Sequence, residues 1–510
     1  MKKLFLLIVL FISVGTGMGA QNFPKVIFPG DYPDPSILRD GKDYYITHSP
    51  FYYAPGFLIW HSTDLMNWEP VCRALPEYEG SAMAPDLLKY QNRYYIYYPT
   101  SAGEIYVIYA DDIRGPWSKP VKLALKGIDP SHVVGEDGKR YLFTNNGWIT
   151  PLSEDGLKVT GPSRKVYDGW EYPANWVTEG KDMYLESPKL LRKDGYYYMI
   201  SAEGGTAGPA TSHMCVVARS KSVFGPWENS PYNPIVHTYS ASENWWSKGH
   251  GTLIDDVNGN WWVVYHAYAN GYHTLGRSTL LEPIEWTSDG WCRTTQEADW
   301  LGKSRQPEWK MEISDDFNGS ELGLQWTFWR EYAPKALTFA DGEMQVKAKG
   351  HTPADGRLLL TTAVDKCYET EVEITLGSGN TGGLLLFYNE EAYAGVTSDG
   401  KNFTVYRAEE KPLTLPNRMG KHFRVKLLNQ GNRVKMSVSA DGKTWEVLAE
   451  NVDVSRLNHN VYKGFYALRP ALFAAGKGKV GFRDFRYRNA IPEEKDMAAY
   501  LMVFHRDEKK

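Results

Sequence analysis

A polar turn followed by a short, aromatic-rich apolar strand recurs along the first 300 residues. Tight polar turns joined to aromatic strands are typical of β-hairpins. The first aromatic residues of successive copies lie 50, 47, 55 and 65 residues apart, about the length of one four-stranded blade with its loops. The pattern predicts a five-bladed β-propeller over residues 21–300, and a β-sandwich of unrelated hairpins is the alternative. The five copies are residues 40–45, 91–95, 136–141, 193–197 and 258–262.

The pattern changes after Trp300. Residues 310–490 alternate between apolar and polar positions in short segments, with Asp-Gly-Lys turns at 399–401 and 441–443. A stretch of this length without a helical pattern predicts a jelly-roll β-sandwich, so the whole chain is expected to be all-β. Residues 491–510 are interpreted as a packed tail or as the start of a truncated further domain.

The first residues indicate export. Lys2 and Lys3 precede an apolar run over residues 4–14, and small residues at 17–20 lead to Gln21. This order is typical of a signal peptide, here residues 1–20, and predicts a periplasmic or secreted protein. No later stretch approaches ~20 apolar residues, so no membrane span is expected.

Composition and charge narrow the classes of partner. The 57 basic and 61 acidic side chains give a net charge of -4, which provides no positive field for nucleic acid. The 18 Trp, 34 Tyr and 19 Phe favour aromatic-lined clefts for an uncharged ligand. The four cysteines are widely spaced, so we expect mostly buried thiols and no structural zinc site.

Candidate chemistry lies just before three of the repeats. Asp34 and Asp129 each precede a proline, and Glu186 lies two residues before one. Proline restricts the backbone beside it and so helps to fix the direction of a carboxylate. A single Asp-Pro pair is usually only a turn. Recurrence at the matching place in three blades predicts carboxylates that converge on the propeller channel, where like charges raise one another's pKa.

The motifs around these acids resemble those of glycoside hydrolase family 43, the five-bladed propeller glycosidases that act on arabinose- and xylose-containing polysaccharides. The resemblance implies that Asp34 is the general base, Glu186 the general acid and Asp129 the residue that tunes the acid, with inversion at the anomeric carbon. The second domain resembles the accessory sandwich of the family, which can help to wall the pocket. The matching segments are residues 32–36, 128–131, 186–188, 201–206, 249–251 and 275–277.

The same resemblance gives candidate substrate-binding residues. Arg277 is expected to hold sugar hydroxyls, and His250 to face the channel as a hydrogen-bonded histidine or a metal ligand. Phe51 and Trp246 are candidates for stacking on the sugar, with packing between blades as the alternative, and Met83 replaces a tryptophan that many family members have. No cofactor is required, although a structural calcium is possible, and the sequence does not determine the oligomeric state.

The substrate expected is an oligosaccharide or polysaccharide that contains arabinose or xylose. The altered pocket floor at Met83 favours an α-L-arabinofuranosidase, and a β-xylosidase of the same family is the alternative. Bulky residues at 51–53 and 244–246, with the sandwich on a third side, predict a pocket and therefore exo action. A non-catalytic glycan-binding propeller is the alternative from another class. Because all three acids are present, catalysis is favoured over binding alone.

Overall fold

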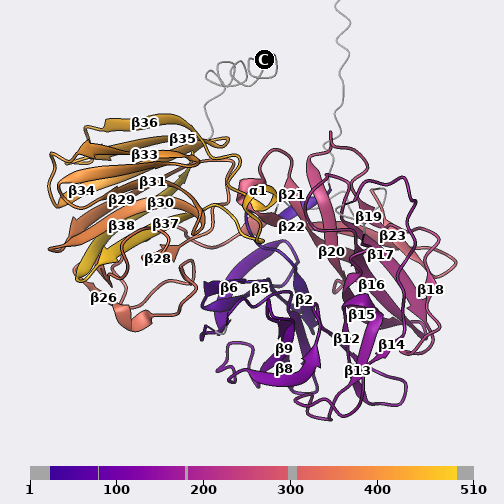
Figure 1. The fold of residues 1–510 in the computed structure, drawn as a ribbon. Coiled ribbons are helices and arrows are strands. Elements are labelled where there is room, and N and C mark those ends of the chain that lie inside the picture. The colour runs from indigo at the N-terminus through magenta and orange to yellow at the C-terminus, as the bar shows by residue number, and fades with distance from the viewer. Residues whose placement is uncertain (1–22, 79, 179–181, 297–306, 491–510) are drawn as a thin grey trace, which may run out of the picture.

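The computed structural model describes residues 23–490 except 79, 179–181 and 297–306. These residues form two β-domains, a propeller and a sandwich, that lie side by side (Figure 1). The predicted signal peptide and the segment 491–510 lie outside the described residues. Among the described residues, no helix is long and apolar enough to cross a membrane.

The propeller has the five predicted blades, each an antiparallel sheet, and each predicted turn joins the first two strands of its blade. Blade one contains β2 (Ser36–Asp40), β3 (Asp43–Thr47), β5 (Gly56–Ser62) and β6 (Asn67–Leu75). Blade two contains β7 (Asp86–Tyr90), β8 (Arg93–Pro99), β9 (Glu104–Ala110) and β10 (Val121–Lys126). Blade three contains β11 (Ser131–Val134), β12 (Arg140–Thr144), β13 (Trp148–Pro151) and β14 (Arg164–Lys165).

Blades four and five complete the ring. Blade four contains β15 (Glu186–Lys193), β16 (Tyr196–Glu203), β17 (Met214–Ser220), β18 (Glu228–Asn229) and β19 (Val236–His237). Blade five contains β20 (Trp245–Asp255), β21 (Trp261–Ala269), β22 (Arg277–Trp286), β23 (Cys292–Thr294) and the N-terminal β1 (Lys25–Phe28).

Strand β1 closes the ring. It pairs antiparallel with β22 of blade five, with Lys25 opposite Leu281 and Phe28 opposite Thr279. The Phe28 ring also packs at 5.0 Å against Trp60 of blade one. Both aromatic side chains are fully buried. A strand from the start of the domain therefore becomes part of the last blade and packs against the first, which ties the two ends of the ring together.

The second domain consists of two packed sheets with an apolar interior. One sheet has the order β33 (Glu410–Pro416), β32 (Asn402–Arg407), β31 (Ala392–Ser398), β30 (Asn380–Asn389), β37 (Arg469–Gly476), β28 (Arg357–Leu360), β25 (Thr327–Trp329) and β4 (Tyr53–Ala54). The other has the order β26 (Leu337–Ala340), β27 (Glu343–Lys347), β38 (Lys479–Asn489), β29 (Cys367–Leu376), β34 (His422–Gln430), β35 (Arg433–Ser439) and β36 (Glu446–Asp453). The predicted β-sandwich is confirmed.

The two domains share a sheet. Strand β4 belongs to a loop of blade one, yet it pairs with β25 of the sandwich, with Tyr53 opposite Trp329. The connecting strand β24 (Glu308–Trp309) adds in parallel to β6 of the propeller. A buried ion pair of 2.9 Å joins Asp31 of the propeller to Arg469 of the sandwich. The sandwich is therefore fixed in position beside the first blade.

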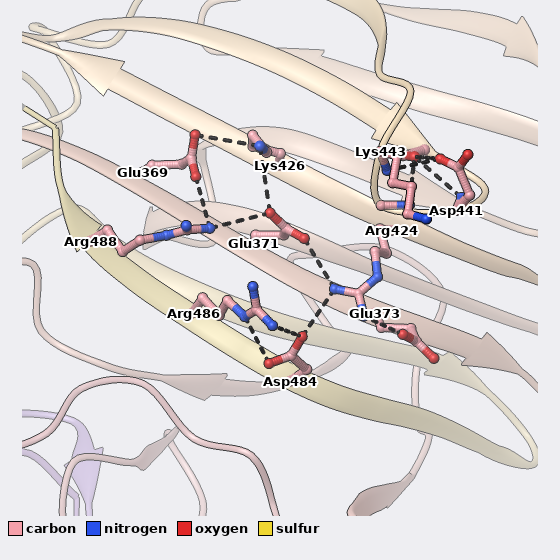
Figure 2. Close-up of polar contacts among 12 residues, drawn as sticks. Glu369, Glu371, Glu373, Arg424, Lys426, Asp441, Lys443, Asp484, Arg486 and Arg488 are labelled. Carbon is pink, nitrogen blue, oxygen red and sulfur yellow. Dashed lines mark hydrogen bonds and ion pairs between the residues drawn. The ribbon is translucent and has the colours of Figure 1, made fainter.

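The outer face of β29, β34 and β38 carries a network of ion pairs (Figure 2). Glu371 lies at its centre and is buried, with Arg424, Lys426 and Arg488 within 3.0, 3.5 and 3.6 Å. Glu371 is therefore the buried carboxylate that the three cations share, and each cation also pairs with a more exposed acid, Glu369, Glu373 or Asp484. Because strand residues alternate between faces, the neighbour Val372 points instead into the apolar interior.

We expect Glu371→Gln to lower the free energy of unfolding by about 3 kcal/mol, because it leaves the cations around a buried position without their shared carboxylate. Urea unfolding followed by circular dichroism measures the change. Glu369→Gln is the matched control, since Glu369 pairs with Arg488 and Lys426 on the same face but is more exposed. It should cost about 1 kcal/mol or less. Equal losses in the two variants would contradict the central role of Glu371.

Candidate active site

The five innermost strands are entered through the same unusual turn. In each blade, one residue with a positive φ angle comes directly before a proline or a glycine. This pair lies at or near the start of the innermost strand in four blades and within the strand in blade five. Few non-glycine residues adopt positive φ, so the recurrence shows one backbone solution repeated five times. The residues are Asp34 (φ 55), Ala84 (φ 26), Asp129 (φ 53), Ser187 (φ 55) and His250 (φ 54).

This repeat places the acids in two different ways. Asp34 and Asp129 occupy the positive-φ position of blades one and three. In blade four Ser187 has that position, and Glu186 lies one residue earlier, at the start of β15. The backbone N–H of Ser187 donates to Oδ2 of Asp129 at 3.1 Å. The sequence prediction put all three acids at the same place in their blades, and for Glu186 the structure corrects it by one residue.

Asp34 is buried among positive and hydrogen-bonding groups. Its Oδ1 accepts from Nη1 of Arg277 at 2.8 Å, and its Oδ2 accepts from the hydroxyl of Ser49. Its backbone N–H donates to Nδ1 of His266 at 3.0 Å. Burial alone would raise the pKa of Asp34, but Arg277, with His250 and His266, holds this pKa well below its usual range. Asp34 is therefore ionised at neutral pH.

Asp129 has the opposite electrostatic character. Burial and the nearby charge of Asp34 raise the pKa of Asp129 to about 7. Carboxylate oxygens of Asp129 and Glu186 lie with a ring nitrogen of His250 within 4.8 Å of one another. Glu186 is half-buried. The site thus separates an ionised carboxylate, Asp34, from a carboxyl cluster that can retain a proton at neutral pH.

Arg277 packs against two neighbouring aromatic rings. Its guanidinium carbon is 5.5 Å from the centroid of Phe51 and 5.1 Å from that of Phe465, and the two rings are 6.2 Å apart. Phe51 belongs to blade one, whereas Phe465 follows α1 (His459–Tyr462) of the sandwich. The backbone N–H of Gly208 in the propeller donates to the side chain of Asn460 in α1 at 3.1 Å, which holds this part of the sandwich against the site.

We expect Arg277→Ala to cost about 2–4 kcal/mol of transition-state binding, because the site loses a charge-assisted donor and Asp34 loses its neutralising partner. The measurement is kcat/KM on a glycoside that the wild type hydrolyses. Arg277→Lys keeps the charge but not the planar fork, so it should recover only part of the loss. An unchanged kcat/KM in the alanine variant would place Arg277 outside the substrate site.

The other predicted residues lie at different distances from this centre. His250 faces it directly, with Nδ1 3.5 Å from Oδ1 of Asp34 and 3.9 Å from Oδ2 of Asp129. Burial lowers the pKa of His250 to about 3, so the ring is neutral. Met83 is half-buried next to Ala84 of the blade-two turn. Trp246 donates its indole N–H to carbonyls of Ala241 and Glu243 in its own loop, rather than to the residues around Asp34.

Two groups of side chains could approach a metal ion. One contains Asp34, His250 and His266, and the other Asp129, Glu186 and His250. Calcium binds six to eight oxygen atoms, whereas these groups offer imidazole nitrogen and at most two carboxylates each. The donor set therefore does not fit a calcium site made by protein groups, and no step below depends on a metal.

Four residues of the site were not singled out from the sequence. Ser49 links Oδ2 of Asp34 to the backbone N–H of Ala84, and Thr206 accepts or donates at 2.8 Å to Nε2 of His266. Thr206 is the last residue of the matched motif at 201–206, so the sequence contained a signal that could have identified it as a site residue. Ser49, His266 and Phe465 lie in ordinary strand or loop sequence, and only the fold brings them to the site.

An ionised carboxylate close to a carboxyl that can retain a proton at neutral pH suits acid–base hydrolysis of a glycosidic bond. Comparison with known proteins agrees with this class. Residues 23–292 match the model of glycosyl hydrolases family 43, and residues 314–488 match that of the β-xylosidase C-terminal concanavalin A-like domain. The chain therefore belongs to glycosyl hydrolases family 43, as the sequence motifs predict.

Individual relatives differ in name. A xylosidase/arabinosidase of Butyrivibrio fibrisolvens is 35% identical over 295 residues, which cover 52% of this chain and 55% of that protein. The non-reducing end α-L-arabinofuranosidase BoGH43B of Bacteroides ovatus is 31% identical over 68% of both chains. The solved GH43 protein BlXynB of Bacillus licheniformis superposes with a TM-score of 0.81 at 28% identity, over 92% of this chain and 100% of that one.

Proposed function

We propose that the protein is an exo-acting, inverting α-L-arabinofuranosidase that releases arabinofuranose from plant polysaccharide side chains. The observation that carries the catalytic part is the electrostatic division between Asp34, held ionised by Arg277, and the Asp129–Glu186 cluster. The sugar preference rests on the expectation that Met83 alters the pocket floor and on similarity to BoGH43B, whose alignment covers 68% of this chain against 52% for the Butyrivibrio protein.

In the proposed mechanism Asp34 accepts a proton from water as the water oxygen forms a bond to the anomeric carbon. Glu186 gives its proton to the glycosidic oxygen as the bond to the leaving sugar breaks. Arg277 donates hydrogen bonds to hydroxyls of the bound sugar, and negative charge on Asp129 favours the protonated form of Glu186 that the general acid needs. Attack and departure on opposite faces invert the anomeric configuration.

Exo action is supported by the walls around Arg277. Phe51 is buried in the turn after β3, and Tyr52 beside it packs against Trp329 and Tyr466 of the sandwich. Phe465 closes the same side from the second domain. Rings from two domains at one side of the channel favour a closed pocket over a cleft that is open at both ends.

β-Xylosidase activity is the second candidate, and a specific observation favours it. Several relatives are named β-xylosidases, among them a Bacillus subtilis protein 32% identical over 301 residues. The concanavalin A-like model that matches the sandwich also carries that name. The predicted signal peptide fits either activity, because polysaccharide substrates lie outside the cell, and we propose an exported location.

The test is to incubate the purified protein with arabinoxylan and with para-nitrophenyl α-L-arabinofuranoside and β-D-xyloside. We expect free arabinose as the sole early product from arabinoxylan, with proton NMR showing inversion. Faster release of xylose would replace the arabinofuranosidase proposal by the β-xylosidase one. A ladder of oligosaccharides in the first minutes would contradict exo action, and binding without turnover would favour the glycan-binding alternative.

A further inference from the structure

A small cavity lies where blade one, strand β24 and the sandwich meet. Its volume of about 50 Å³ leaves room for about three water-sized groups, which excludes a sugar ring. Strand β6 supplies Arg73 to its wall, β24 supplies Trp309 and β37 supplies Arg469. Asp31 and His48 of the propeller also line it. Both domains therefore contribute charged groups to one cavity.

The charges around this cavity do not balance. Arg469 pairs with Asp31 at 2.9 Å, whereas Arg73 donates to backbone carbonyls, those of Pro55 and Leu324. No carboxylate in the described part of the chain pairs with Arg73. Burial lowers the pKa of Arg73 to about 10, and the positive charge of Arg469 acts in the same direction, so Arg73 remains charged at neutral pH. One guanidinium at the cavity therefore has no counter-ion among the described residues.

The cavity wall also has more unpartnered donors than acceptors. Nε of Arg469, Nε1 of Trp309 and both ring nitrogens of His48 are buried without a hydrogen-bond partner among the described residues, as is Oδ1 of Asp31. His48 and Arg469 are only 6% and 7% exposed. Burial lowers the pKa of His48 to about 3, so its neutral ring offers one donor and one acceptor. Three N–H donors are thus present with two acceptors, and buried groups left unpaired cost free energy.

We propose that this interdomain cavity is a binding site for a small monovalent anion such as chloride. The anion accepts hydrogen bonds from Arg469 and Trp309 and offsets the charge of Arg73. Water alone would satisfy the donors but would leave a guanidinium without a counter-ion in a mostly buried place. A single unbalanced positive charge favours a monovalent anion over a divalent one. Because Arg73 and Arg469 come from different domains, the bound anion stabilises the contact between them.

The cavity is separate from the catalytic centre. Ser49 lines it and also donates to Oδ2 of Asp34, so one side chain contacts both places. The residues assigned to catalysis and to sugar binding are not part of the wall. They are Asp34, Asp129, Glu186, Arg277, Phe51 and Phe465. An anion here therefore does not occupy the sugar pocket, and its binding can be tested without any assay of hydrolysis.

Thermal unfolding of the full chain measures this binding. Protein dialysed into sodium gluconate, whose anion is too large for the cavity, is titrated with sodium chloride at constant ionic strength. We expect Tm to rise by about 2–5 °C and then to saturate, as it does when a ligand binds only the folded state. A Tm that stays constant, or that changes linearly without saturation, would overturn the site.

Variants locate the effect. Arg73→Met removes the unbalanced charge at similar length and should abolish the saturable rise in Tm. Arg93→Met is the matched control, because Arg93 pairs with Asp111 on blade two and does not line the cavity. It should keep the wild-type rise, and equal responses in the two variants would contradict the proposal. Trp309→Phe keeps an aromatic ring but loses one donor, so half-saturation should need about 3- to 10-fold more chloride.

Diffraction from wild-type crystals grown in sodium bromide tests the position directly and does not depend on the folding of a variant. Bromide carries the same charge as chloride, and its anomalous scattering identifies it. We expect an anomalous peak inside the cavity, beside Nε of Arg469. No peak there at a bromide concentration that saturates the rise in Tm would overturn the site, since the anion would then bind elsewhere on the protein.

Discussion

Asp34→Asn should remove turnover almost completely on every substrate, by at least about 10³-fold in kcat, because no other ionised carboxylate is positioned to accept the proton of the attacking water. The variant keeps the shape of the side chain and can still accept a hydrogen bond from Ser49. The loss should be the same for good and poor leaving groups, since the base acts on water and not on the departing oxygen. Stopped assays of kcat with aryl glycosides and with arabinoxylan measure it.

A matched control is Glu282→Gln, which changes another buried carboxyl of the propeller, bonded by the Tyr265 hydroxyl at 2.6 Å. This variant should keep most of its turnover. A loss of less than about tenfold in Asp34→Asn would assign the general base to a different residue.

The second large effect is expected from Glu186→Gln, and it should depend on the leaving group. The leaving group of an oligosaccharide or polysaccharide is a sugar alkoxide, which departs slowly unless it is protonated. The kcat for these substrates should therefore fall by about 10²–10⁴-fold without a proton donor. Dinitrophenyl glycosides depart without protonation, and their kcat should fall far less. Plotting log kcat against leaving-group pKa for both proteins shows the change as a steeper slope in the variant.

Glu203→Gln is the control for this measurement. Glu203 lies on the neighbouring strand β16 and accepts from the backbone N–H of Trp170 at 2.6 Å. Burial raises the pKa of Glu203 to about 8, so its side chain is already uncharged at neutral pH and glutamine preserves the contact. It should leave the slope unchanged. The same slope in wild type and Glu186→Gln would show that Glu186 is not the acid.

The repeats and the prolines were enough to predict the architecture and that Asp34, Asp129 and Glu186 come close together. Polar turns before aromatic strands are local features, so five copies reveal five blades without any knowledge of their arrangement. Proline next to Asp34 and Asp129 likewise acts on the adjacent backbone. Even so, the one-residue offset of Glu186 from Ser187 could not be deduced, because only the φ angles show which residue occupies the repeated turn.

The remaining parts of the site depend on contacts between distant segments. Phe465 lies more than 400 residues after Phe51 in the chain, and no local pattern connects them. His266 is one of several buried residues in β21, where its neighbours serve only the blade core. The closure of the ring by β1 was also not predicted. This strand has only four residues, and so short a pattern is not enough to assign it to the last blade.

The strand shared between the domains limits how this protein can be divided. Because β4 of the propeller completes a sheet of the sandwich, cutting the chain between the domains would expose one unpaired strand edge on each half and remove Phe465 from the pocket. The C-terminal half is therefore not a portable module that could be exchanged among enzymes as independent binding domains are. Recombination that preserves function should transfer residues 23–490 as a single unit, and chimaeras joined at the linker should be insoluble or inactive.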